Sequence, residues 1–243
     1  MDQILTEASV ARTARKAKAR EVGAAPHGNV PANPAAKQAQ RDADKTRLRI
    51  LTAAAAEFAQ KGLAGARVDA IAEASGANKR MIYYYFGSKE GLYTAVLERA
   101  YTDMRDSERA LALDHLEPFE GIRKLVEFKF DYFVENPTTI SLLNGENMLD
   151  AEYLKTKSDR LTDMHASLVR TIDGLLKRGV RSGAMRRGVD PLHLYISISA
   201  LSYFYFSNAS TLSTAFGRKL ATPAENKLRR RHAVEVILAY LKA

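Results

Sequence analysis

The sequence contains no cysteine, and it lacks the sequence motifs that are characteristic of common enzyme classes. Without cysteine the chain has no disulfide, no thiolate metal site and no catalytic thiol. A phosphate-cradling glycine loop, a His-Glu-x-x-His motif and a nucleophile elbow are also missing. The histidines do not have the spacing of metal ligands: they are His27, His115, His165, His193 and His232. These absences predict a protein that is not an enzyme and requires no cofactor.

Long hydrophobic runs are scarce as well. The first thirty residues lack the apolar segment of a signal peptide. No Asp, Glu, Lys or Arg occurs from Pro191 to Gly217, but the densely apolar part, Leu192 to Phe206, contains serines and falls short of the ~20 apolar residues of a membrane span. A buried core helix is therefore favoured over the alternative of a membrane span, and we expect a cytoplasmic protein.

Positive charge, by contrast, is in excess. Lysine and arginine number 37 against 28 aspartates and glutamates, so the formal net charge is +9. A basic chain suggests a polyanionic partner, although many basic proteins have none. The 243 residues, of which 46% are hydrophobic, suffice for one large domain or two small ones.

Residues 1 to 40 are predicted to form a disordered basic tail. The stretch from Gly23 to Gln40 lacks the apolar periodicity needed to bury a face. Five basic residues precede it: Arg12, Arg15, Lys16, Lys18 and Arg20. This tail is either a solvated extension or an arm that contacts DNA phosphates or a minor groove.

A helical pattern begins near residues 42 to 45. Leu48, Leu51, Ala55 and Phe58 recur at steps of three and four residues, which lines one face of a helix that Gly62 is placed to end. The fold class indicated by this and the following segments is all-α, because no alternating strand pattern occurs.

Two short helices follow and describe a helix-turn-helix over residues 67–86. The first runs from Val68 to Ser75, and Gly76 can adopt the left-handed conformation of a tight turn. Asn78 is placed to cap a helix over residues 79–85. Ser88 is placed to cap a fourth helix that runs past residue 101.

The helix after Asn78 sorts its side chains in an informative way. At ~100° per residue, Ile82, Tyr85 and Phe86 fall on one side. Arg80, Tyr83 and Tyr84 fall on the other side, and such side chains can contact phosphates and base edges. The competing interpretation is an aromatic core patch, but consecutive aromatic residues on a helix cannot all face one core.

The remaining segments also predict helices. Apolar residues at helical spacing cover 118–135, then about 138–147 and about 151–177. Asp190-Pro191 is a helix start signal, and Thr222-Pro223-Ala224-Glu225 adds a capping box.

Residues 44 to 104 resemble the DNA-binding head of the TetR family. The matching segments are Ala55–Gly62, Ile71–Ala77 and Ile82–Leu92, the last with an aromatic run followed by Ser-Lys-Glu. The resemblance implies a three-helix head joined to a helical ligand-binding and dimerisation body over residues 105–243.

The resemblance also implies roles for individual side chains of the head. Tyr83 and Lys89 match positions that contact phosphates, and Asn78 and Lys79 open the recognition helix beside the DNA backbone. Base edges face the positions of Arg80, Met81 and Tyr84. Arg67 stands where the family usually has a small hydroxyl residue, and it can still reach a phosphate.

For the body, the resemblance implies a four-helix dimer interface built from residues 191–208 and 222–241. The segment 190–220 also resembles a subgroup associated with aromatic-acid and nicotinate catabolism. Candidate ligand contacts lie near an expected helix junction and on later helices: Asn144, Glu146, Asn147, Met148, His165, Tyr203 and Phe204. For each of them, an ordinary core or surface position is the competing interpretation.

The expected partners are therefore a near-palindromic double-stranded DNA operator, a second copy of the chain and a small-molecule inducer, for which an aromatic compound is one candidate. The expected function is a transcriptional regulator, a repressor that its inducer releases from the operator. Two alternatives remain: a helical binding protein whose head has lost DNA affinity, and an enzyme that uses a pocket in the body.

Overall fold

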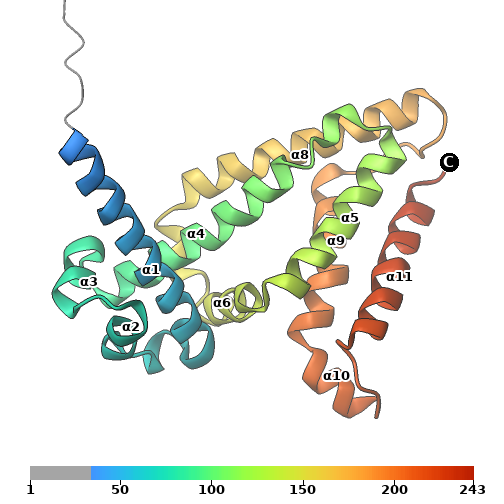
Figure 1. Cartoon of the computed structure of the whole chain (residues 1–243). Coiled ribbons are helices and arrows are strands. Elements are labelled where there is room, and N and C mark those ends of the chain that lie inside the picture. Colours follow the sequence, from blue (N-terminus) through green and yellow to red (C-terminus); the bar gives the residue numbers. More distant parts are fainter. Residues whose placement is uncertain (1–33) are drawn as a thin grey trace, which may run out of the picture. The chain divides into compact units, whose positions relative to one another are not determined.

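The computed structural model describes residues 34–243, so the part of the expected basic tail before residue 34 lies outside the described residues. Residues 40–243 form one compact unit. That unit is helical, and within the described range the strand-like pairing is limited to an isolated bridge between Met185 and Lys242. The prediction of an all-α fold is confirmed (Figure 1).

The first helix, α1 (Pro34–Gly65), begins earlier than the sequence suggested. Its residues 37–47, before the first leucine of the apolar pattern, are exposed or half-exposed, so no apolar periodicity marks them. Local bonds along the helix include one from the Gln40 amide to the Asp44 carboxylate, at 3.0 Å. Hydrophobic patterning alone could not locate this start.

The next three helices begin where the sequence predicts: α2 (Val68–Ser75), α3 (Lys79–Phe86) and α4 (Lys89–Arg109). Gly62 and Gly76 both have positive φ, at 67° and 63°, which permits the turns expected of them. Buried side chains of these helices form one core: Ile50, Leu51, Ala54, Phe58, Ile71, Ile82, Leu92, Tyr93, Val96 and Leu97.

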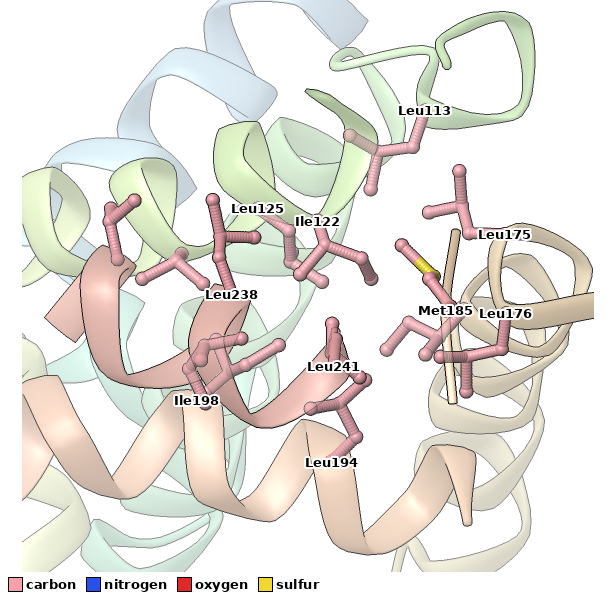
Figure 2. Packing of buried hydrophobic residues seen from close by; sticks show 14 of the residues in the cluster. Leu113, Ile122, Leu125, Leu175, Leu176, Met185, Leu194, Ile198, Leu238 and Leu241 are labelled. Atoms are coloured by element: carbon pink, nitrogen blue, oxygen red, sulfur yellow. The ribbon is translucent and has the colours of Figure 1, made fainter. Parts of the chain in front are cut away.

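The remaining elements are η1 (Leu113–His115), α5 (Pro118–Glu135), α6 (Pro137–Met148), α7 (Glu152–Lys155), α8 (Ser158–Arg181), α9 (Pro191–Ser207), α10 (Ala209–Ala215) and α11 (Pro223–Leu241). A second core joins α5, α8, α9 and α11. Figure 2 shows side chains of this core converging from these helices, together with Leu113 of η1 and Met185 of the segment between α8 and α9. Among residues 34–243, no helix is long and apolar enough to cross a membrane.

The prediction of a single helix over residues 151–177 is wrong. Two helices, α7 and α8, occupy this stretch. Asp150 and Ala151 have positive φ, and the buried Glu146 carboxylate accepts hydrogen bonds from the N–H groups of Tyr153 and Leu154 at 2.8 and 2.9 Å. These contacts from α6 fix the short α7 separately, and no local pattern of residues reveals them.

Two helix starts agree with the sequence. Asp190 accepts a hydrogen bond from the N–H of His193 at 2.8 Å, and Thr222 accepts one from the N–H of Glu225 at 3.3 Å. The Glu225 carboxylate, expected to complete a capping box, instead pairs with Arg218 at 2.7 Å. The start of α11 therefore relies on its threonine cap and Pro223.

Candidate functional site

The orientation of α3 is set by one buried side chain and one cap. Ile82 is fully buried in the core of the first helices, with the rings of Tyr85 and Phe86 packed against that core. The Asn78 side chain accepts a hydrogen bond from the N–H of Met81 at 2.9 Å, which starts the helix. The sequence-based sorting of this helix into a buried and an exposed side is confirmed for these residues.

The opposite side of α3 carries a cation and two phenols in solvent. Arg80, Tyr83 and Tyr84 are exposed, and the Tyr84 side chain retains 82% of its accessible surface. Exposed aromatic rings that cluster on one face often mark an interaction site. A guanidinium and two hydroxyls on one face can together contact phosphate oxygens and base edges.

Polar neighbours flank this exposed face. Lys79 forms an ion pair of 2.6 Å with Asp69 of α2, and both side chains are more than half exposed, so the pair contributes little stability. Met81 is half-buried between the two sides of the helix. Arg67 is exposed just before α2, and its backbone N–H donates to the Glu57 carboxylate at 3.1 Å.

The amino group of Lys89 already has hydrogen-bond partners within the protein, which the resemblance did not imply. Its amino group donates to the carbonyl oxygens of Ala64 and Ala66 at 3.3 and 3.2 Å, so it satisfies backbone acceptors at the end of α1. An ammonium has three donors, and one remains for a phosphate. The structure thus gives Lys89 a structural role beside the predicted one.

The residues predicted to contact a ligand do not form one site. Asn144 and Asn147 of α6 both hydrogen-bond the hydroxyl of Tyr203 from α9, where burial raises the pKa of that tyrosine. Met148 retains 87% of its accessible surface, and Phe204 is also exposed. Of the residues predicted to contact a ligand, hydrogen bonds join only Asn144, Asn147 and Tyr203 to one another.

Two other predicted ligand residues have structural partners. Glu146 is buried and holds α7, as described above. The half-buried ring of His165 shares a hydrogen bond of 2.7 Å with the carbonyl of Leu161 and contacts the rings of Tyr101 and Tyr195. Burial lowers the pKa of His165, so its ring is neutral near pH 7.

Sequence reasoning missed a group of buried charges in the body, which we name the buried cluster. It comprises the buried side chains of Arg105 and Glu108 of α4 and Lys129 of α5, together with the half-buried Tyr195 of α9. Arg105 and Lys129 both pair with Glu108, at 2.5 and 3.1 Å. A signal was available, because Lys129 falls within the apolar stripe of its helix, between Val126 and Phe133.

A cavity of about 150 Å³ opens beside the buried cluster. Arg105 and Glu108 form part of its wall, and the other lining residues are Arg109, Ala112, Leu113, Asp114, Met164, Ser167, Leu168 and Thr171. Its walls come from α4, η1 and α8, so it lies in the body rather than against α3. None of the ligand contacts proposed from the sequence lines this cavity.

Comparison with known proteins gives two matching family models. Residues 50–96 match the model described as bacterial regulatory proteins, tetR family, and residues 118–237 match a tetracyclin repressor-like C-terminal domain. The HTH-type transcriptional repressor NicS of Pseudomonas putida is 37% identical over 181 residues, which cover 74% of this chain and 85% of NicS. The chain belongs to the TetR family. In this TetR-family protein the first model covers most of the core of the first helices, and the second covers most of the core that joins α5, α8, α9 and α11.

Further relatives of this TetR-family protein are regulators as well. The HTH-type transcriptional regulator RutR of Escherichia coli O157:H7 is 32% identical over 171 residues, covering 70% of this chain and 78% of RutR. A TetR family transcription regulator from Marinobacter aquaeolei VT8 shares the fold with a TM-score of 0.63 at 21% identity, covering 84% of this chain and 98% of that one. The Bacillus subtilis regulator FadR, solved in complex with stearoyl-CoA, aligns with a TM-score of 0.60 at 15% identity, covering 79% and 98%.

Proposed function

We propose that this chain is a transcriptional repressor that a small molecule releases from its operator. The observation that carries the proposal is the exposed face of α3, where Arg80, Tyr83 and Tyr84 stand in solvent beside a buried anchor, Ile82. Membership of a family of DNA-binding regulators supports the same conclusion. The head comprises residues 44–104, with the helix-turn-helix at 67–86, and the body comprises residues 105–243.

In this proposal α3 enters the major groove of DNA. Arg80, Met81 and Tyr84 face base edges, which supply sequence discrimination. The phosphate contacts position the head, and the residues assigned to them are Arg67, Asn78, Lys79, Tyr83 and Lys89. Lys89 makes its contact with the donor that the carbonyls of Ala64 and Ala66 leave free.

The functional unit in this proposal is a homodimer, since one recognition helix reads only a half-site. Helices α9 and α11 pack on the core with one side and expose apolar residues on the other: Leu192, Ile196, Phe204, Leu228, Val236 and Tyr240. Pairing these two helices with their copies covers those side chains. Two heads then occupy successive major grooves, ~34–36 Å apart or somewhat more, on a near-palindromic operator.

Helix α4 provides a route from ligand to DNA. Two residues separate its first residue from the end of α3. Near its other end it carries Arg105 and Glu108, which line the cavity. A ligand that binds more tightly to one position of α4 favours one separation of the two heads, and release follows when that separation no longer fits the grooves. The protein acts on DNA in the cytoplasm.

Selection of binding sites from a random pool of double-stranded DNA tests the proposal. We expect the purified full chain to enrich a near-palindrome of two half-sites, and Arg80→Ala to change or relax the preference within each half-site. Arg187→Ala, an exposed arginine before α9, serves as the matched control and leaves the preference unchanged. Failure of the chain to enrich any sequence would contradict the proposal.

A further inference from the structure

The buried cluster holds more positive than negative charge. Arg105, Glu108 and Lys129 are 4%, 3% and 2% exposed, so water does not stabilise their charges. Two cations share one carboxylate, which leaves one positive charge without an ionic partner in the cluster. Desolvating an unpaired charge is costly, and an anion that binds beside it would reduce that cost.

The groups that face the cluster from the neighbouring helices are two phenols and an imidazole, and none of these three is a carboxylate. Tyr195 of α9 lies 2.6 Å from Arg105 Nη2 and 3.3 Å from Lys129 Nζ through its hydroxyl oxygen. Burial raises the pKa of Tyr195, but the charges of Lys129 and Arg105 outweigh that effect and leave the pKa below its ordinary value. From α8, His165 faces the cluster as a neutral ring, and Tyr101 of α4 is protonated because burial raises its pKa to about 12.

Arg105 also has donor capacity to spare. Its Nε makes no hydrogen bond within residues 34–243, and its contact with Glu108 through Nη1 is an ion pair without hydrogen-bond geometry. A buried N–H without an acceptor is rare and costs free energy. Because Arg105 also lines the cavity, its side chain is adjacent to any molecule that enters the cavity.

The cavity restricts the size and the chemistry of that acceptor. Its volume of about 150 Å³ is comparable to cavities that hold a single six-membered ring (~150 Å³). Leu113, Met164 and Leu168 supply apolar walls, and Ser167 and Thr171 supply hydroxyls. Arg109 and Asp114 add one charge of each sign, so the net positive charge beside the cavity comes from the buried cluster. A compact apolar group with one negatively charged end matches these walls and the cationic cluster together.

From the charge imbalance, the unpartnered N–H and the cavity, we propose that the effector of this regulator is a small organic carboxylate, whose carboxylate binds at Arg105 while its apolar group fills the cavity and the charge of Lys129, behind Glu108, favours the bound anion. The inference rests on the proposed function, since it names the chemical class of the releasing molecule. Arginine suits the role because its planar fork matches a carboxylate. Inorganic anions are the other source of negative charge, and the experiment below separates the two.

The experiment compares acids with their neutral amides. Benzoate and benzamide form one pair of probes, and butyrate and butyramide form another. Their binding to the full chain is measured by thermal shift and calorimetry, without DNA and in a buffer of constant chloride. We expect at least one acid to stabilise the protein and its amide to do so roughly tenfold less, or not at all.

Variants of the cluster locate the binding. Lys129→Met leaves the Arg105–Glu108 pair intact and neutral, and we expect it to reduce acid affinity roughly tenfold to a hundredfold. Arg105→Lys, which keeps the charge and loses the fork, covers the case in which Lys129→Met does not fold, and it also weakens acid binding. Lys177→Met, the same change at an exposed site on α8, is the matched control and retains full affinity.

Four results would overturn the proposal: amides that bind as well as acids, acid affinity that Lys129→Met and Arg105→Lys leave unchanged, no stabilisation by either acid, or equal stabilisation by phosphate. Operator binding by the same preparations is measured separately. A chain that binds operator but no acid refutes only the carboxylate inference, and one that binds an acid but no operator refutes only the proposed function.

Discussion

Replacing Tyr84 by alanine separates DNA recognition from folding. Tyr84 is 82% exposed, and its ring contacts that of Tyr85 at a centroid distance of 5.3 Å. Its removal from the folded chain therefore costs little, within ~0.5 kcal/mol as for other surface substitutions. We expect the thermal midpoint of unfolding to remain close to that of the wild type.

The same substitution has a larger effect on the operator complex. A side chain that reads a base edge contributes ~1–3 kcal/mol of discrimination, and a dimer inserts two copies. The predicted loss is at least ~2 kcal/mol per dimer, which corresponds to an increase in Kd of about thirtyfold or more. Fluorescence anisotropy with operator DNA and with scrambled DNA of equal length measures this loss, and binding to scrambled DNA is expected to change much less.

Two further variants sharpen the result. Tyr84→Phe retains the ring, so it distinguishes contact with a thymine methyl from hydrogen bonding by the hydroxyl. Phe216→Ala removes an exposed aromatic ring outside the head and is the matched control, with unchanged operator affinity expected. Operator affinity that Tyr84→Ala leaves unchanged would refute the assignment of the recognition face.

The other predictions concern packing, charge and assembly. Ile82→Ala removes a fully buried side chain, so we expect ~2–5 kcal/mol of lost stability by denaturant unfolding, and a loss under 1 kcal/mol would contradict the packing of α3. The pKa of Tyr101 is raised to about 12 in the folded chain, so this tyrosine loses its proton at a lower pH in the unfolded chain. The free energy of unfolding should therefore fall as pH rises from about 10 to 12, and it should fall less steeply in Tyr101→Phe. Identical pH profiles of the two proteins would contradict the raised pKa. Ile196→Asp places a charge on the exposed side of α9, and sedimentation should detect monomers, whereas an unaltered dimer would exclude this helix from the interface. Deleting residues 1–33 removes five basic residues of the expected arm, so the slope of log affinity against log salt concentration should become shallower. An unchanged slope would mean that this segment does not contact DNA phosphates.

The head could be predicted closely because its signals are local. Asn78 and Gly76 act within one turn of the residues they terminate, so their roles are legible in the sequence and agree with the structure. The buried anchor Ile82 follows from helical periodicity in the same way. The start of α1 escaped prediction because its first turns bury no apolar face.

The body was less predictable because its decisive contacts are distant in sequence. Glu146, near the end of α6, accepts hydrogen bonds from the N–H groups of Tyr153 and Leu154 in α7, and α7 and α8 together replace the single long helix expected there. Helix α10 lies in a stretch of serines and threonines, residue types that favour turns over helices by bonding to their own backbone.

The candidate ligand site shows the same limit. Arg105 and Glu108 are three residues apart on α4, a spacing that on most helices is a solvated ion pair. Their burial depends on Lys129 and Tyr195 from two other helices. Polarity near a helix junction led instead to Asn144, Asn147 and Tyr203, which bond to one another.

Binding of the purified chain to fragments of its own genome, at two salt concentrations, tests the central claim most directly. The account predicts that a few fragments are bound tightly and retained at the higher salt, with two chains per site, and that Tyr84→Ala abolishes this selectivity. Weak binding that treats all fragments alike and disappears at the higher salt would show that α3 does not read DNA sequence, and it would contradict the account.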